Sequence, residues 1–173
     1  MTEETESLIT DEAISTADQY LTYTVGKEEY GIKILSVREI RGWEPVARVP
    51  NTPAYIKGVL NLRGTAVPVV DMRIRMNITD PVYDSTTVLI VLRATINGAE
   101  RVAGIVVDSV SDVMNAQTGD IRKTPDFGKN ADTEFILGLA DVDGKMINLF
   151  DVDSFMCHAD IYDTPEHQEE AES

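Results

Sequence analysis

The sequence predicts a mainly β protein made of two small barrels in tandem, with short helices, because it repeats itself and because short apolar runs alternate with turn signals. Residues 56–76, IKGVLNLRGTAVPVVDMRIRM, align at a shift of eighty with residues 136–156, ILGLADVDGKMINLFDVDSFM. Residues 30–40 align at a shift of seventy-three with residues 103–113. Glycines coincide in both alignments and the blocks keep their order, which predicts two copies of one supersecondary unit.

The first copy begins with two strands. Residues 21–25 alternate apolar and threonine side chains, which predicts a half-buried strand, and residues 30–34 form the returning strand after a turn at 26–29. Residues 36–43 place two apolar residues among charged ones. This pattern fits a short exposed strand or a single helical turn, and periodicity does not choose between them.

A hairpin over residues 58–70 follows, and Gly64 supplies the positive φ of its turn. Pro68 has no amide hydrogen, so we expect its strand to lie at an edge or to carry a bulge. Asp71 is predicted to cap a short helix over residues 72–76. Each copy therefore contains about five short strands and a helical turn, as in a small closed or nearly closed barrel.

The second copy begins with a continuous apolar run. Residues 86–94 contain VLIVL, which predicts a strand covered on both faces. Asn97-Gly98 is the strongest hairpin turn signal in the chain. Residues 135–150 repeat the earlier hairpin, and Asp151 is predicted to cap a last short helix with one apolar face.

The net charge of −15 is concentrated at the two ends of the chain. Residues 1–18 and 158–173 hold six acidic residues each and no lysine or arginine, which predicts disordered acidic tails. Residues 19–157 hold 18 acids and all 15 bases, a net charge of −3. We expect them to form one domain of two subdomains, about 19–82 and about 83–157.

This composition excludes several classes of function. A nearly balanced core with acidic tails lacks the basic face that nucleic acids and anionic membrane surfaces require. The longest apolar run, residues 88–92, is far too short to span a membrane, and the first residues resemble no signal peptide. The single Cys157 allows no internal disulfide, and we expect it to be a core or near-core thiol. These features predict a cytoplasmic protein.

The sequence also offers little for catalysis. His158 follows the last predicted helix and His167 lies in the acidic tail, so neither is well placed to act as a base. The run at 141–144, DVDG, resembles the start of a calcium loop but lacks the downstream acidic ligand, and the repeat makes it a hairpin turn. We therefore expect no enzyme activity, no metal and no cofactor.

The repeat provides an internal control, since features of one copy alone are candidates for function. Arg63 aligns with Asp143, so the hairpin does not require an arginine there, and a solvated turn arginine and an interface anchor are about equally favoured. Glu39 and Asp112 are both acidic, which favours a role common to both copies. Val37 either contributes to an exposed contact face beside Glu39 or packs inward.

Four motifs together resemble the CheW family of chemotaxis coupling proteins, over nearly all of residues 19–156. They are PNTPAYIKG at 50–58, GVLNLRGTAVPVVDMR at 58–73, GIVVDSVSDV at 104–113 and ILGLADVDGKMINLFDVD at 136–153. The resemblance implies two five-stranded SH3-like barrels with a hydrophobic groove between them.

The resemblance also implies a non-catalytic adaptor that couples transmembrane chemoreceptors to the histidine kinase CheA in receptor arrays. Its expected partners are the regulatory domain of CheA, which shares this fold and docks barrel to barrel, and the cytoplasmic tips of methyl-accepting chemoreceptors. In the family, the positions of Val37, Glu39, Gly58 and Arg63 are associated with partner binding. With their neighbours, the candidate set is Val37, Glu39, Ile40, Gly58, Asn61, Arg63 and Gly64. A CheW-like scaffold for a kinase of another motility or biofilm pathway is the alternative.

Overall fold

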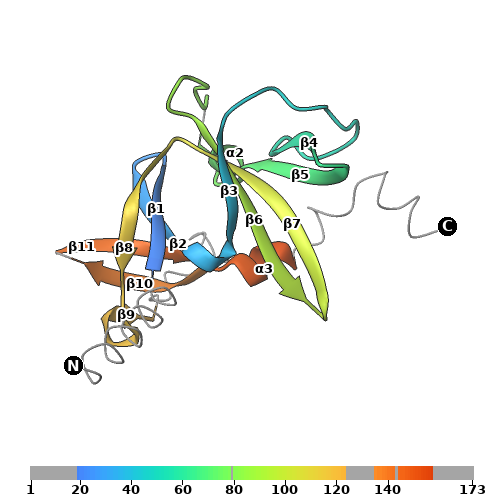
Figure 1. The fold of residues 1–173 in the computed structure, drawn as a ribbon. Helices are drawn as coiled ribbons and strands as arrows, with labels where there is room; N and C mark the ends of the chain where they lie inside the picture. The colour runs from blue at the N-terminus through green and yellow to red at the C-terminus, as the bar shows by residue number, and fades with distance from the viewer. Residues whose placement is uncertain (1–18, 79, 124–134, 143, 158–173) are drawn as a thin grey trace, which may run out of the picture.

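In the part of the chain that the structure describes, two β-sheets are accompanied by two short helices (Figure 1). The structure, a computed structural model, describes residues 19–78, 80–123, 135–142 and 144–157. The predicted acidic tails, with His158 and His167, lie outside these residues. Sheet A has the order β8 (Ser109–Asn115), β1 (Gln19–Val25), β2 (Glu28–Lys33), β11 (Lys145–Phe150), β10 (Ile136–Val142) and β9 (Ile121–Arg122). Sheet B has the order β3 (Val37–Gly42), β6 (Val88–Ile96), β7 (Ala99–Val107), β5 (Thr65–Asp71) and β4 (Ile56–Leu62).

The prediction of a mainly β fold is confirmed, and in place of the two expected five-stranded barrels the described residues form one six-stranded and one five-stranded sheet. Helices α2 (Met72–Arg75) and α3 (Val152–Met156) follow the two aligned hairpins, and short 3-10 turns occupy Ile34–Ser36 and Thr118–Asp120. The capping predictions also hold, because the side chain of Asp71 accepts a hydrogen bond from the amide of Arg73 and that of Asp151 accepts one from the amide of Ser154.

The sheets do not follow the two halves of the chain. Strands β1 and β2 pair with strands of the second half in sheet A, whereas β6 and β7 pair with strands of the first half in sheet B. The expected division near residue 82 therefore does not separate the sheets. The exchange is symmetric, because parallel pairing joins Gly31 to Leu149 in sheet A and joins Gly104 to Val69 at the equivalent positions of sheet B.

The exchange places the largest hydrophobic core between the sheets. Residues of β1, β2, β6, β7 and both helices form one cluster, and each sheet has a smaller cluster of its own. Strand β6 faces two of these cores, since Ile90 and Leu92 join the shared cluster while Leu89 and Val91 join that of sheet B. All four side chains are at most 2% exposed, which confirms the prediction of a strand covered on both faces. Burial of each stabilises the fold by about 1.5–3 kcal/mol.

Two aligned glycines allow another segment to approach the backbone closely. Strands β4 and β10 are both bulged at their aligned glycines. A Cβ at Gly58, where φ is +147°, would lie 2.0 Å from the carbonyl oxygen of Ala47, and one at Gly138 would lie 2.6 Å from that of Arg122. Both copies thus use glycine to let a crossing segment pair with the outer hairpin strand.

The structure corrects two expectations and decides between two alternatives. Strand β5, which contains Pro68, is not an edge strand, since it pairs with both β4 and β7. The bulge of this hairpin lies in β4 and not in β5. Pro68 is tolerated because the ladder between β5 and β7 begins only at Val69, so no partner in β7 requires the missing amide hydrogen. For residues 36–43 the strand alternative is observed, because β3 covers Val37–Gly42 directly after the 3-10 turn at Ile34–Ser36. Cys157 is exposed rather than near the core, because it is the residue after the buried end of α3.

Candidate functional site

The β4–β5 hairpin carries four of the seven candidate residues. Arg63 and Gly64 form its two-residue turn and both have positive φ, 52° and 88°. The side-chain oxygen of Asn61 accepts a hydrogen bond of 2.9 Å from the amide of Gly64. Turns with two positive φ angles favour asparagine, aspartate or glycine at the first position. An arginine there is conformationally unfavourable, so local folding does not explain Arg63.

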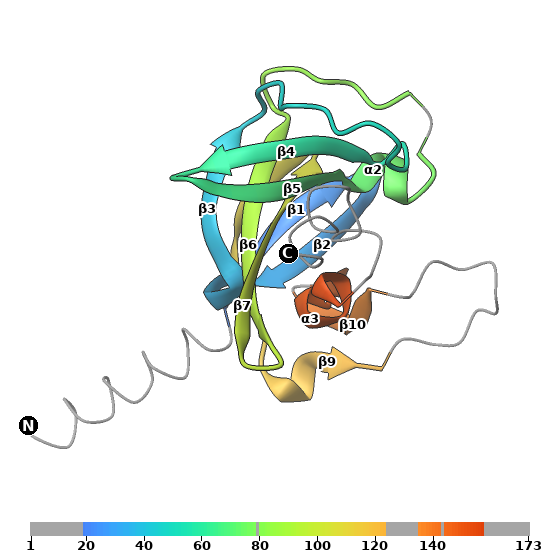
Figure 2. The same ribbon diagram turned by 90° about the vertical axis from the view of Figure 1, so that its right-hand side faces the viewer.

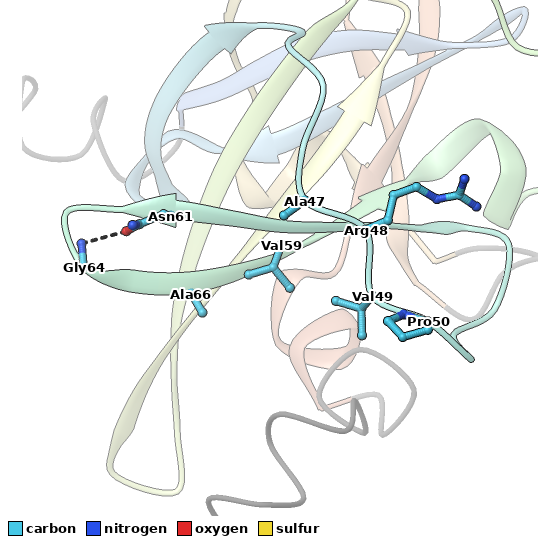
Figure 3. Close-up of a pocket in the computed structure, with 8 residues that line it drawn as sticks. All are labelled: Ala47, Arg48, Val49, Pro50, Val59, Asn61, Gly64 and Ala66. Atoms are coloured by element: carbon cyan, nitrogen blue, oxygen red, sulfur yellow. Dashed lines mark hydrogen bonds between the residues drawn. The ribbon is translucent and has the colours of Figure 1, made fainter.

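A hollow of about 480 Å³ lies on the outer face of this hairpin (Figure 3). Its lining is mostly apolar and consists of Ala47, Arg48, Val49, Pro50, Val59, Asn61, Gly64 and Ala66. The hairpin forms one wall and residues 47–50 form the other, held by a hydrogen bond of 2.7 Å from the amide of Val59 to the carbonyl of Ala47. The side chain of Arg48 extends away from the other lining side chains (Figure 3), which leaves the hollow apolar.

The remaining candidates lie on β3. Val37 and Glu39 are partly buried, and Val37 packs against the shared core, which supports the inward alternative for that residue. Ile40 is 46% exposed and is the apolar residue that this strand offers to solvent. Within the described part of the chain, neither Glu39 nor Arg63 forms an ion pair, so both charges are available to a partner.

The structure keeps the candidates in two groups. Strands β3 and β4 lie at opposite ends of sheet B, with β6, β7 and β5 between them. Gly58 is buried and presents no side chain, so it can affect binding only through the position of Ala47 and the wall of the hollow. Figure 2 shows the β4–β5 hairpin crossing in front of β6 and β7, with β3 at the side.

A buried ion-pair network was not predicted from the sequence. The guanidinium of Arg73, 1% exposed, makes two hydrogen bonds of 3.0 Å with the carboxylate of Asp71 and one of 3.0 Å with that of Asp108. The hydroxyl of Tyr83 donates to Asp71, and its ring lies 4.6 Å from the guanidinium carbon. The aligned position of Arg73 is Asp153, so the repeat comparison could have singled out Arg73.

These contacts shift two pKa values. Burial alone would lower the pKa of Arg73, but the hydrogen bonds and charges of Asp71 and Asp108 outweigh it and raise the pKa. Burial, with the hydrogen bond to Asp71, raises the pKa of Tyr83 to about 12. Arg73 therefore stays charged and Tyr83 stays neutral across the physiological range, which gives the network a structural rather than a proton-transfer character.

A second depression, of about 680 Å³, lies where the two sheets meet. The β1–β2 turn lines it on one side with Val25 and Gly26, and the segment after α2 lines it on the other with Ile78 and Val82. Val82 is 63% exposed. The resemblance implies a hydrophobic groove at this junction, but most of the junction is filled by the shared core, and the depression is also lined by the charged residues Lys27, Glu28, Arg73, Asp80 and Asp108.

Two kinds of feature are absent from the described residues, a metal-ligand cluster and a membrane-spanning helix. Among the described residues, no three His, Cys, Asp or Glu side chains gather in a way that could hold a metal ion. No helix in this part of the chain is long and apolar enough to span a membrane. The described residues therefore form a two-sheet domain with an apolar hollow on one hairpin and with two charged side chains, Glu39 and Arg63, outside its ion pairs.

Comparison with known proteins agrees with this class. The CheW-like domain model matches residues 19–160. The chain is 45% identical over 138 residues to the chemotaxis protein CheW of Klebsiella aerogenes, covering 80% of this chain and 81% of that protein. It is 37% identical over 136 residues to CheW of Rhizobium meliloti, covering 79% and 85%. The crystal structure of the scaffolding protein TtCheW from Thermoanaerobacter tengcongensis is similar, with a TM-score of 0.70, 28% identity and coverage of 86% and 94%.

The chain belongs to the CheW family of chemotaxis coupling and scaffold proteins.

Proposed function

We propose that this protein is a non-catalytic adaptor that couples transmembrane chemoreceptors to the histidine kinase CheA. The observation that carries the proposal is Arg63, a cation without an ion-pair partner in the described structure, held at positive φ beside an apolar hollow. The aligned turn has Asp143 instead, so the repeat does not require this arginine. Conformationally costly residues at exposed positions are characteristic of functional sites.

The proposed partners are the regulatory domain of CheA and the cytoplasmic tips of the chemoreceptors. The hairpin group around Arg63 and the β3 group around Glu39 and Ile40 are the proposed contacts. The exposed side chain of Ile40 and the apolar hollow supply buried area, whereas Glu39 and Arg63 set register and select partners. The adaptor would act in the cytoplasm, attached to the membrane arrays through its protein contacts alone.

Calorimetric titration of the full chain with each partner tests this function. We expect the wild type to bind both partners, and we expect Arg63→Ala and Glu39→Ala each to weaken at least one interaction by about tenfold. Arg122→Ala is the matched control, because Arg122 is an exposed arginine in the other sheet. Failure of the wild type to bind either partner would reject this function and favour a scaffold of another signalling pathway.

A second variant separates binding from folding. Arg63→Asn places at the turn a residue that tolerates positive φ, so we expect it to stabilise the fold by roughly 0.5–1 kcal/mol while it weakens binding. Thermal unfolding followed by circular dichroism measures the first effect and the titration measures the second. A loss of both stability and binding would show instead that the arginine has a structural role.

A further inference from the structure

The outer faces of the two aligned hairpins differ at several positions, including one cross-strand pair close to the turn. In the first hairpin Ala66 pairs with Asn61, and in the second Met146 pairs with Asp141 at the equivalent positions. Both residues of each pair are exposed. The side chain of Met146 is 47% exposed and projects as a large apolar group beside a carboxylate. The same backbone therefore carries a small side chain in one copy and a projecting one in the other.

The small side chain leaves the hollow open. Ala66 lines it together with Val59, which the second copy replaces with the larger Leu139. The methyl group of Ala66 is among the lining groups in Figure 3. A methionine at position 66 would extend into the space bounded by residues 47–50. The volume of about 480 Å³ accommodates a large partner side chain and its immediate neighbours.

The chemistry of the hollow defines what fits it. Ala47, Val49, Pro50, Val59 and Ala66 provide an apolar lining. The neighbouring turn carries the charge of Arg63, which has no ion-pair partner in the described residues. A partner surface complementary to this hollow would carry an apolar side chain of leucine or methionine size with a carboxylate beside it. The apolar side chain would fill the hollow while the carboxylate faces Arg63. The second hairpin of this chain shows that such a pair can stand on a β-hairpin of this fold.

We propose that Ala66 determines which partner side chain this hairpin accepts, by keeping the hollow open for an apolar residue flanked by a carboxylate. This inference rests on the proposed function. The occupant to which it commits is a β-hairpin of the regulatory domain of the kinase. Position 66 is thus a specificity position, where an increase in side-chain size excludes the partner without disturbing the fold.

The test is a calorimetric titration of the regulatory domain into the full chain with graded side chains at position 66. We expect Ala66→Val to weaken binding, Ala66→Met to weaken it by about tenfold or more, and the control Ala66→Ser to stay within about twofold of the wild type. Because the side chain is exposed, the thermal unfolding midpoints of all variants should remain close to that of the wild type.

The outcomes distinguish this inference from the proposed function. If the wild type binds the regulatory domain and Ala66→Met binds equally well, the function stands and the specificity role of Ala66 is rejected. If Ala66→Met changes only self-association in sedimentation velocity, the occupant is a second copy and the proposal also fails. If the wild type binds neither kinase domain nor receptor tip, the function and the inference are rejected together.

Discussion

The hairpin–helix unit at residues 56–76 and its copy at residues 136–156 share three backbone features and differ in what surrounds the helix cap. Both units contain a bulge glycine, a turn glycine and an aspartate cap. In the first unit Asp71 is completely buried and bonded to Arg73 and Tyr83, whereas in the second Asp151 is half-buried, with Asp153 at the position of the arginine. The two copies thus have similar backbones, but only the first has the side-chain network among the described residues.

The network of the first unit also connects the two sheets. Asp108 follows β7 at the point where the chain crosses from sheet B to sheet A, and one of its oxygens bonds Arg73. Its other oxygen accepts a hydrogen bond of 2.6 Å from the amide of Gly26 in the β1–β2 turn. A single arginine therefore links the hairpin of one sheet to a turn of the other, and the second unit has no equivalent among the described residues.

The largest expected effect is a difference in the free energy of unfolding between variants of the two capping aspartates. Asp71→Ala leaves Arg73 buried with half of its partners, so we expect a loss of about 3–5 kcal/mol in the free energy of unfolding. Asp151→Ala removes a cap alone and should cost about 1 kcal/mol. Urea denaturation followed by circular dichroism measures both values. Equal losses would mean that the buried network adds no stability beyond capping.

The two bulge glycines should differ by a smaller amount. Gly58→Ala places a methyl group 2.0 Å from a carbonyl oxygen at a φ of +147°, so we expect a cost of about 2–4 kcal/mol. Gly138→Ala meets its carbonyl at 2.6 Å and lacks the positive φ, so it should cost less. Urea titration of both variants tests the order. The reverse order would show that the segment at Ala47 moves more easily than the segment at Arg122.

The smallest expected effect is a change of stability with pH, and it concerns only the first unit, which contacts Tyr83 through Asp71. The pKa of Tyr83 rises from its ordinary value of 10.0 to about 12 because burial and the bond to Asp71 favour the neutral phenol. Its contribution to stability is therefore complete below pH 10 and is lost as the pH rises towards 12. The stability difference between the wild type and Tyr83→Phe, from urea denaturation at pH 8 to 11.5, should be constant at first and then decline. A constant difference throughout would contradict the raised pKa.

Local signals account for what the sequence predicted well. The turn at Asn97-Gly98, the caps at Asp71 and Asp151, and the two-sided burial of β6 each depend on a few neighbouring residues, and all were confirmed. Among the site residues, the repeat alignment singled out Arg63 because Asp143 replaces it.

The features that escaped prediction depend on residues distant in the chain. The strand exchange follows from pairings such as Gly31 with Leu149, which no periodicity within one strand encodes. The ion-pair network joins Arg73 to Asp108, and the hollow exists because residues 47–50 lie against Ala66. Comparing the copies position by position would have marked Arg73 and Ala66 as different, but only the fold shows what those differences contact.

The exchange of strands also imposes an order on synthesis at the ribosome. Strand β2 is complete once Lys33 has been made, yet its partner β11 begins at Lys145, and the side chain of Asn148 bonds the carbonyl of Glu29 across 119 positions. At typical rates of translation the nascent N-terminal hairpin waits on the order of ten seconds for that partner. During this interval its apolar face and unpaired strand edge are exposed, so this part of the emerging chain is where we expect chaperones to bind.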